Sequence, residues 1–390
     1  MELVQQQFPG STGGRRWVIV TGEYPPQRGG VGDYTQRVAA GLVRCGDEVH
    51  VFAPPAEGQT ATDGVHVHRL PDHFGPRSLR AMSRLLRQIP SPRTLLLQYV
   101  PHAFGFRSIN VPFCVWWAMQ RREYRAVMFH EVSSPIDLRL YLKHSILGTV
   151  HRPMAAILIA SANQVFTSTD AWRPLLERLG CPAARTTTLA IPSNLPESAK
   201  PQAVERHRSR LAGDARVLLG SFGTFGTYVA PLAAEVIQTV LQQVPECGAA
   251  VIGRGSRLFV SNWIRDDSLR RRIAVADDLD ADEAAAAIAA CDVMVQPYQD
   301  GVTTRRTSMM ASLALGKAVV TNAGVLTEPF WQNSNACSVV NGIEAMPAEA
   351  VQLLQSATRR EELSAAARQF YEERFSLGRV IGIMRSVCRH

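Results

Sequence analysis

The sequence contains little that would place it among secreted, zinc-binding or membrane-spanning proteins. Its seven cysteines are scattered over 390 residues and form neither a CxxC pair nor a ladder of short spacings. That pattern argues against a zinc site and a disulfide framework, so we expect reduced thiols in the core. No run approaches the roughly 18 apolar residues that a membrane span requires. Residues 1–17 lack the apolar segment of a secretory leader, and we therefore expect a cytoplasmic location.

Charge of one sign is also scarce outside one region. Residues 201–390 contain 20 basic and 20 acidic side chains and are therefore neutral overall. The net charge of +8 comes from residues 1–200, which contain 22 basic and 14 acidic side chains. Within these, ten arginines lie between residues 69 and 125, against Asp72 and Glu123. The surplus indicates an anionic partner, which charge alone leaves open as a nucleotide, a membrane or a nucleic acid. Since no helix-turn-helix, KH, RRM or zinc-finger pattern accompanies the arginines, we do not expect a nucleic acid.

What the sequence does contain is a repeated alternation of apolar strands and amphipathic helices. A strand expected at 17–21 leads into a glycine-rich turn and a helix, and strand-like runs follow as far as 164–168. Such alternation is typical of a parallel sheet covered on both faces. The proline-rich segment 189–203 interrupts the pattern, which starts again near residue 216. We predict an α/β protein with two doubly wound, Rossmann-like domains, residues 1–190 and 191–375.

Glycines directly precede the first helix, which we expect to begin near Asp33 with that residue as its N-cap. Gly29 and Gly30 remove the side chains that would keep a ligand from the backbone amides, and a helix N-terminus favours negative charge. The spacing does not match GxGxxG, so it provides no dinucleotide fingerprint. Gly29 and Gly30 therefore predict a site that binds an anionic donor substrate. The alternative is a sharp turn that binds no ligand.

A histidine and a glutamate, His130 and Glu131, follow the apolar strand expected at 125–129. Open α/β sheets bind their ligands at the carboxyl ends of their strands, which makes both residues catalytic candidates. A histidine with a near-neutral pKa can orient a substrate hydroxyl or transfer a proton. A structural histidine with satisfied hydrogen bonds is the alternative.

Two loops of the second domain carry side chains suited to phosphate. Gly223 and Thr224 follow its first strand, where amides and hydroxyls can contact a phosphate. The longer loop 296–308 leads into a helix and presents hydroxyls and two guanidiniums, which can grip phosphate bidentately. Its donor-binding candidates are Tyr298, Thr303, Thr304, Arg305, Arg306, Thr307 and Ser308. The alternative is an N-capped helix preceded by a solvated basic turn.

Taken together, these motifs resemble the GT-B glycosyltransferases and, within them, family 4, a retaining group that uses nucleotide-sugar donors. The loop at 29–35 looks like the family's N-terminal glycine loop, and His130 falls where the family has a histidine that contacts the donor sugar. Residues 290–298 and 314–321 look like its nucleotide-sugar segment. The resemblance implies two domains facing a cleft, with the acceptor on the first and the donor diphosphate on the second. We also expect a C-terminal helix at 376–390 that crosses back to the first domain.

The chain departs from the family in two respects. Many members carry two glutamates separated by seven residues, and neither is present; the first would fall near Thr303, and Asp300 could approximate it. A basic pair after the first strand of the second domain is also missing, and we expect Arg305 or Arg306 to supply that charge, with Arg254 as a weaker candidate. The missing acids leave an inactive partner subunit open, and a nucleotide-sugar epimerase is another alternative. The family's mechanism requires neither a metal nor a cofactor.

Part of the arginine surplus falls on a helix expected at 77–89, at spacings of three and four residues. A basic amphipathic helix of this kind lies on anionic lipid. The residues predicted to face an acceptor or a membrane are Arg77, Arg80, Arg84 and Arg87, with the nearby Trp116 and Trp117. In related enzymes this region faces the acceptor, often a lipid-linked sugar, so we expect a role in polysaccharide biosynthesis at the inner face of the membrane. An ordinary surface helix whose arginine stems cover the core is the alternative.

Overall fold

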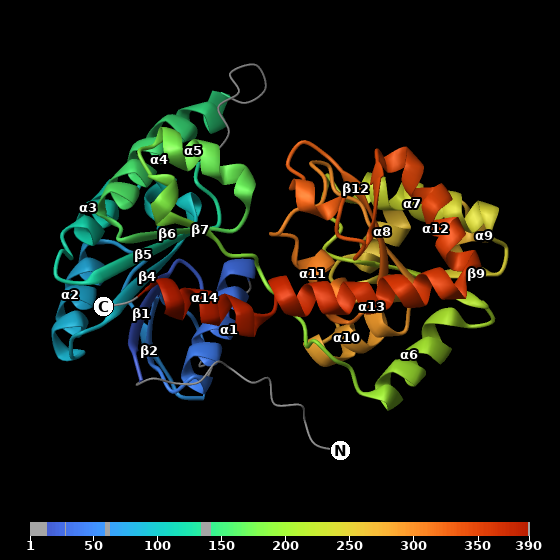
Figure 1. The fold of residues 1–390 in the computed structure, drawn as a ribbon, viewed down its shortest axis with the longest axis horizontal. Coiled ribbons are helices and arrows are strands. Elements are labelled where there is room, and N and C mark those ends of the chain that lie inside the picture. Colours follow the sequence, from blue (N-terminus) through green and yellow to red (C-terminus); the bar gives the residue numbers. More distant parts are fainter. Residues whose placement is uncertain (1–13, 28, 59–62, 134–141, 389–390) are drawn as a thin grey trace. The chain divides into compact units, whose positions relative to one another are not determined.

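The computed structural model describes residues 14–27, 29–58, 63–133 and 142–388. By its internal contacts the chain divides into a first unit, Met1–Ala190 with Leu377–His390, and a second unit, Ile191–Ser376. Each unit is built on its own parallel sheet, with helices on both faces (Figure 1). The predicted α/β class with two doubly wound sheets is therefore confirmed.

The first unit contains a seven-stranded sheet in which neighbouring strands are parallel. Its strands are β1 (Arg16–Thr21), β2 (Glu48–Ala53), β3 (Val65–Arg69), β4 (Thr94–Tyr99), β5 (Tyr124–Phe129), β6 (Gln164–Thr167) and β7 (Thr186–Thr188). The order β3-β2-β1-β4-β5-β6-β7 places β2 on one side of β1 and β4 on the other. The carboxyl ends of β1 and β4 thus form a topological switch point, where open sheets of this kind bind ligands.

Helices α1 (Gly30–Arg44), α2 (Pro76–Gln88), α3 (Val111–Ala118), α4 (Leu142–Ser161) and α5 (Arg173–Arg178) complete this part of the first unit. The first helix begins at Gly30, three residues before the expected N-cap. Helix α3 begins after Asn110, because its side-chain oxygen accepts a hydrogen bond from Phe113 N at 3.0 Å and caps the helix. The sequence pattern also predicts a helix at 136–160. Its first residues lie outside the described ranges, and α4 is its described part.

The last helix, α14 (Leu377–Val387), belongs to the first unit although it follows the second in sequence (Figure 1). It packs along α1, where a Cβ at Gly41 would lie 3.0 Å from Ile381 Cδ1, so the glycine allows this close approach. Arg385 Nη2 lies 3.2 Å from Asp47 Oδ1, and Trp17 Nε1 donates to the other oxygen of Asp47 at 3.0 Å. Asp47 and Arg385 are both buried, so this pair fixes α14 against the sheet.

The second unit contains a six-stranded parallel sheet in the order β10-β9-β8-β11-β12-β13. Its strands are β8 (Val217–Phe222), β9 (Cys247–Ile252), β10 (Ile273–Ala276), β11 (Val293–Gln296), β12 (Ala318–Ala323) and β13 (Ser338–Asn341). Its helices are α6 (Pro201–Ala212), α7 (Ala230–Gln243), α8 (Ser256–Trp263), α9 (Asp267–Arg270), α10 (Ala281–Ala289), α11 (Thr307–Ala314), α12 (Met346–Gln355) and α13 (Ala357–Arg374). The switch point of this sheet lies between β8 and β11.

Short apolar runs explain the central strands of both sheets. Strand β4, for example, is buried along its whole length, as expected for a parallel strand with helices on both faces.

The seven cysteines are buried thiols. Among the described helices, none is both long enough and apolar enough to cross a bilayer.

Candidate active site

His130 lies directly after β5, the strand next to β4 and thus beside the switch point of the first sheet. Its backbone N–H donates to Tyr99 O at 3.1 Å, and its Nε2 lies 2.8 Å from Gln98 Oε1 at the end of the neighbouring β4. The edge of its ring meets the ring of Tyr34 on α1 at 5.1 Å between centroids. Two carboxyl-terminal strand ends and one helix therefore hold the imidazole in place.

Burial lowers the pKa of His130 to about 3, so the side chain is neutral at physiological pH. Because an amide oxygen only accepts, Nε2 carries the proton that Gln98 Oε1 accepts, and Nδ1 is left as an acceptor. The Gln98 Nε2 and Tyr99 hydroxyl groups are buried without a hydrogen-bond partner among the described residues. A neutral imidazole beside the partly unpaired Gln98 amide is suited to orienting a hydroxyl-bearing ligand rather than to carrying a proton.

Glu131, the other predicted residue of this pair, pairs with His102 and has no hydrogen bond or ion pair with His130 in the described structure. Its carboxylate lies 3.7 Å from His102 Nδ1, and both side chains are largely exposed to solvent. Exposed ion pairs of this length contribute little to stability. Of the two candidates, therefore, only His130 is buried beside the switch point.

The glycine loop of the first unit is occupied by a residue of its own segment. Glu23 Oε1 accepts hydrogen bonds from Val31 N at 2.8 Å and Gly32 N at 2.9 Å, in the first turn of α1. A Cβ at Gly29 would overlap the Glu23 carboxylate, whereas a Cβ at Gly30 would meet open space. An external phosphate would have to compete with Glu23 for these amides. Sequence reasoning missed this role of Glu23, for which an acid shortly before a glycine-rich helix start is the only signal.

In the second unit, the loop from β11 to α11 is held by residues of β12 and the segment after it. Tyr298 N donates to Asn322 Oδ1 and Asn322 Nδ2 donates to Tyr298 O, both at 2.8 Å. Gly301 has a φ of +85°, and a Cβ there would overlap Thr327 Oγ1. The loop therefore requires glycine at this position and packs directly against the chain that follows β12.

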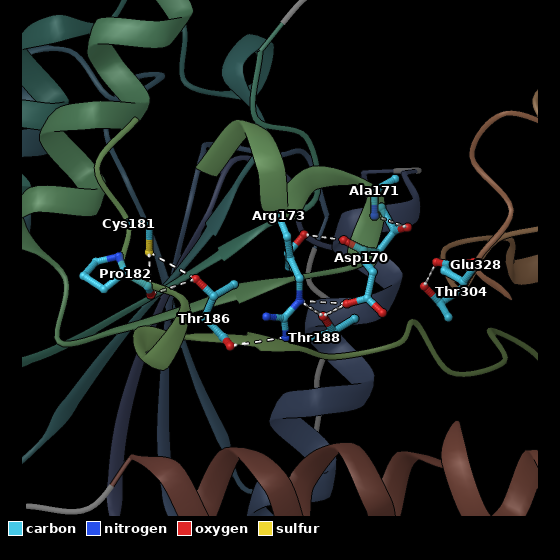
Figure 2. A network of polar contacts seen from close by, with 11 residues as sticks. Asp170, Ala171, Arg173, Cys181, Pro182, Thr186, Thr188, Thr304 and Glu328 are labelled. Atoms are coloured by element: carbon cyan, nitrogen blue, oxygen red, sulfur yellow. Dashed lines mark hydrogen bonds and ion pairs between the residues drawn. The ribbon is translucent and has the colours of Figure 1, made fainter. Parts of the chain in front are cut away.

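A buried carboxylate, Glu328, fixes the centre of this loop. Its Oε1 accepts from Thr304 Oγ1 at 2.8 Å and from Thr304 N at 3.3 Å, and its Oε2 accepts from Trp331 Nε1 at 2.9 Å. Figure 2 shows Glu328 and Thr304 facing each other. The remaining contacts drawn there belong to the first unit, where Asp170 Oδ1 accepts from Arg173 Nε at 2.8 Å. Sequence reasoning missed Glu328, because an acid 24 residues away gives no local signal.

The end of the loop combines two guanidiniums with a helix N-terminus that no acid occupies. Helix α11 has no side-chain cap and no acidic residue in its first turn, which starts with Thr307. The Arg306 guanidinium lies 4.8 Å from the centre of the Tyr298 ring, and burial, then the charge of Arg305, lower its pKa. The Tyr298 hydroxyl is 2.8 Å from Ser308 Oγ, and burial raises the pKa of Tyr298 to about 12.

Two polar atoms of this loop have no partner among the described residues, namely the buried Thr303 Oγ1 and Arg306 Nε. Asp300, the predicted substitute for a family glutamate, lies 4.0 Å from Arg306 Nη2 and is 42% exposed. It therefore neutralises Arg306 only weakly. An anion placed at this helix terminus would meet positive charge, free donors and amide dipoles together.

The loops after β8 and β9 carry the other predicted donor contacts. Gly223 N donates to Ile252 O at 3.1 Å, and a Cβ at Gly253 would overlap Gly223 O. Thr224 and Arg254 are exposed on these loops. Gly223 keeps open space where a side chain would lie, so its backbone is accessible to a ligand.

The predicted membrane-facing residues separate into two groups. The four arginines of α2 are exposed, and the side chain of none of them has a hydrogen bond or ion pair with another residue in the described ranges. They are Arg77, Arg80, Arg84 and Arg87. Trp116 and Trp117, in contrast, are 9% and 0% exposed, because α3 turns them toward the core. Trp116 Nε1 donates to Ser83 Oγ of α2 at 2.8 Å. Trp117 is therefore a core residue and not a surface contact, and Trp116 reaches the surface only at the edge of a groove beside α2.

Residues 29–192 match a family described as a glycosyl transferase 4-like domain. A search of curated proteins finds no match to the sequence. Sucrose-phosphate synthase from Thermosynechococcus elongatus is structurally similar with a TM-score of 0.73 at 14% identity, covering 96% of this chain and 98% of that chain. Anabaena HepE in complex with UDP and glucose is similar with a TM-score of 0.68 at 14% identity, covering 95% of this chain and 98% of that chain. A putative UDP-N-acetylglucosamine 2-epimerase from Listeria monocytogenes is similar with a TM-score of 0.58 at 10% identity, covering 96% of this chain and 95% of that chain.

These comparisons show the fold and a family resemblance of the first unit. The chain has the GT-B fold of two Rossmann-like domains, and its residues 29–192 are similar to a glycosyl transferase 4-like domain. The predicted resemblance to the GT-B glycosyltransferases of family 4 is confirmed by the family model and the fold, and the predicted enzyme class agrees with the family model.

Proposed function

We propose that this protein transfers a sugar from a nucleotide-diphosphate donor to a hydroxyl of a glycan or lipid-linked acceptor, with retention of anomeric configuration. The observation that carries the proposal is the uncapped N-terminus of α11, with Arg305 and Arg306 before it and the unpaired Thr303 hydroxyl beside it. This site lies at the carboxyl end of β11, at the switch point of the second sheet. A UDP complex of the structurally similar HepE supports a nucleotide as ligand.

The chemistry of sugar transfer fits such a site. When the bond between the anomeric carbon and the leaving oxygen breaks, negative charge grows on the terminal phosphate of the nucleotide. Arg305, Arg306 and the amides of α11 stabilise that charge more in the transition state than in the bound donor, which is the condition for catalysis. These groups perform this role without a metal ion.

His130 contributes to the same reaction by hydrogen bonding in its neutral form. Its Nε2 proton is engaged by Gln98, so Nδ1 can accept from a sugar hydroxyl and fix the orientation of the ring. Asp300 and Glu131 contribute no acid at a buried position, because both are exposed to solvent.

The donor site is tested by nucleotide binding to Arg305→Ala, Arg306→Ala and the double variant. We expect each single change to weaken UDP, GDP or TDP binding by about 10- to 100-fold, since a charge-assisted hydrogen bond contributes roughly 1.5–3 kcal/mol. Arg265→Ala, which removes an exposed arginine from the same unit, is the matched control and should bind normally. If neither single variant changes the Kd measured by calorimetry, the phosphate does not bind here.

Two other functions share this fold, namely a nucleotide-sugar epimerase and an inactive partner subunit. The structural similarity to a putative 2-epimerase is the reason to consider an epimerase. The absence of the family's two glutamates is the reason to consider an inactive subunit. A panel of UDP-, GDP- and TDP-sugars separates them. Transfer or hydrolysis that His130→Ala abolishes supports the transferase, an epimerised sugar supports the epimerase, and binding without turnover supports the inactive subunit.

The acceptor in this proposal is attached to the inner face of a membrane. Its basis is the row of exposed arginines on α2, which find no acidic partner among the described residues. Such a row attracts the anionic surface of a bilayer and would bring a lipid-linked hydroxyl to the first unit.

A further inference from the structure

We propose that a second element, the α3 stripe, inserts into the membrane while the arginines of α2 bind the lipid phosphates. The α3 stripe consists of Phe106, Ile109, Val111, Val115 and Met119. This inference deepens the proposed function and rests on its membrane-bound acceptor. It assigns the insertion to the face of α3 opposite the two tryptophans that the sequence patterns single out.

The α3 stripe is a run of large apolar side chains in contact with solvent. Phe106 is 53% exposed, Ile109 40%, Val111 36%, Val115 45% and Met119 70%. Val111, Val115 and Met119 follow each other at intervals of four residues, which places them on one face of the helix. Five exposed apolar side chains within fourteen positions are a concentration of the kind that marks an interaction site.

The opposite face of α3 explains why this surface exists. Phe113, Cys114, Trp116 and Trp117 of the same helix are buried in the core of the first unit. The helix is apolar on all sides, and a helix of that composition is normally enclosed by protein or lipid. Here the protein encloses one side only.

The conformation before α3 also directs an aromatic side chain outward. Phe106, Arg107 and Ser108 have φ values of +50°, +52° and +73°, a run in the left-handed region that favours glycine. His151 Nε2 lies 3.1 Å from Ser108 O and holds this turn. Unfavourable backbone angles at an exposed phenylalanine fit a role outside the fold itself.

Helix α2 cannot insert by its own apolar face, because that face is already used. Met82 and Leu86 are buried against the sheet. Its arginines remain outside, and the hydrogen bond between Trp116 and Ser83 joins α2 to α3. An open groove of about 400 Å³ runs between them, lined by Leu79, Arg80, Ser83, Arg84, Arg87 and Trp116. The groove presents guanidiniums next to an apolar wall, as a phospholipid headgroup requires.

Charge selects an anionic bilayer as the partner. Arg107, Arg121 and Arg122 flank the stripe and are exposed, and they too have no ion pair with another described residue. The two nearby acids are already engaged. Asp72 accepts from Gly75 N at 2.7 Å, and Glu123 pairs with the buried Arg93 at 2.6 Å. The surface is therefore positive around an apolar centre, which is the composition of an interfacial membrane anchor.

The experiment is co-sedimentation of the full chain with vesicles of phosphatidylcholine, with and without phosphatidylglycerol. Three variants are compared with the natural chain: Val115→Asp/Met119→Asp, Arg80→Ala/Arg84→Ala, and the apolar rescue Val115→Leu/Met119→Leu. Leu258→Asp, which changes a 67% exposed apolar residue of α8 in the second unit, is the matched control for added charge. Thermal unfolding and the Kd for UDP are measured for every variant.

We expect the natural chain to bind anionic vesicles in a salt-sensitive manner. The aspartate variant should lose at least about tenfold in partitioning even at low salt, because apolar insertion is lost. The alanine variant should lose about fivefold for each arginine removed, on anionic vesicles only. The leucine rescue and Leu258→Asp should bind as the natural chain does, with unfolding temperature and UDP affinity unchanged throughout.

Several outcomes would overturn the inference. One is a natural chain that does not sediment with anionic vesicles, and another is an aspartate variant that binds them normally. A third is a natural chain that dimerises in light scattering and becomes monomeric in the aspartate variant, with no vesicle binding, because the stripe would then be a protein interface. If the natural chain binds anionic vesicles but does not bind UDP, the proposed transferase function is contradicted and the membrane-binding role of this surface is retained.

Discussion

At the scale of the residue, His130 illustrates how tertiary burial changes what a side chain can do. A histidine in water has a pKa near 6.5 and exchanges protons at physiological pH. In the folded chain its pKa falls to about 3, because the ring is enclosed by Tyr34, Gln98 and the strand ends. Of the two roles that the sequence suggests, orienting a hydroxyl remains and proton transfer near neutral pH does not.

The depressed pKa gives a prediction about stability. Between about pH 3 and 6.5 the unfolded chain binds a proton at His130 that the folded chain does not, so the free energy of unfolding rises with pH through this window. This contribution is complete above about pH 6.5 and falls by up to about 1.4 kcal/mol per pH unit as the pH decreases. His130→Gln should flatten the pH dependence of denaturant unfolding between pH 6 and 4.

His102→Gln is the control for this measurement, because its side chain is 65% exposed and carries no comparable burial. It should leave the slope of the natural chain unchanged. Equal slopes for the natural chain and His130→Gln would contradict the depressed pKa. Any activity that depends on His130 should likewise show no histidine ionisation between pH 5 and 8.

At the scale of the element, the start of α1 depends on a contact between Glu23 and backbone amides. The carboxylate accepts from the first turn of the helix and lies where a Cβ of Gly29 would be. The same contact removes the amides from an external phosphate, whereas the start of α11 lacks such an acid. The glycine-rich loop before α1 and the hydroxyl-rich loop before α11 therefore differ in whether their helix amides are available to a phosphate.

Adjacent glycines of this element provide a matched pair of substitutions. We expect Gly29→Ala to lower the free energy of unfolding by about 1–3 kcal/mol, because the new methyl group displaces Glu23 and leaves buried amides without an acceptor. Gly30→Ala should be neutral or stabilising by up to about 1 kcal/mol, since its Cβ meets open space within a helix. Chemical denaturation of both variants measures the difference, and equal effects would mean that Glu23 does not cap the helix.

At the scale of the whole molecule, the first unit is assembled from both ends of the sequence. Helix α14 returns to α1 after the second unit is complete, and the buried pair of Arg385 and Asp47 holds it there. The second unit, Ile191–Ser376, contains no part of this contact.

Removal of residues 377–390 should therefore destabilise the first unit alone. Loss of Arg385 leaves Asp47 buried with one partner fewer, for which a cost of about 3–5 kcal/mol is usual. Calorimetry should show one transition at a lower temperature and a second that UDP still raises. A truncated chain in which the UDP-sensitive transition moves instead would contradict the division into units.

Much of the fold is predictable from local patterns, and particular elements show why. The strand expected at 17–21 is observed as β1 (Arg16–Thr21), because a short apolar run between turn residues has one stable arrangement in a parallel sheet. Helix α3 shows where this fails. Its sequence is apolar on every side, so periodicity cannot tell which face packs, and the tryptophans expected at the surface are buried.

The candidate sites divide in the same way. The sequence by itself determined the two doubly wound sheets, the position of His130 after a central strand and the basic character of 69–125, since these follow from local composition and periodicity. Only the tertiary structure decided that Glu23 fills one helix terminus, that Glu328 braces Thr304 and that Val115 and Met119 face solvent. The physical reason is that hydrogen bonds and packing join residues far apart in the chain, and their partners are chosen when the sheet assembles.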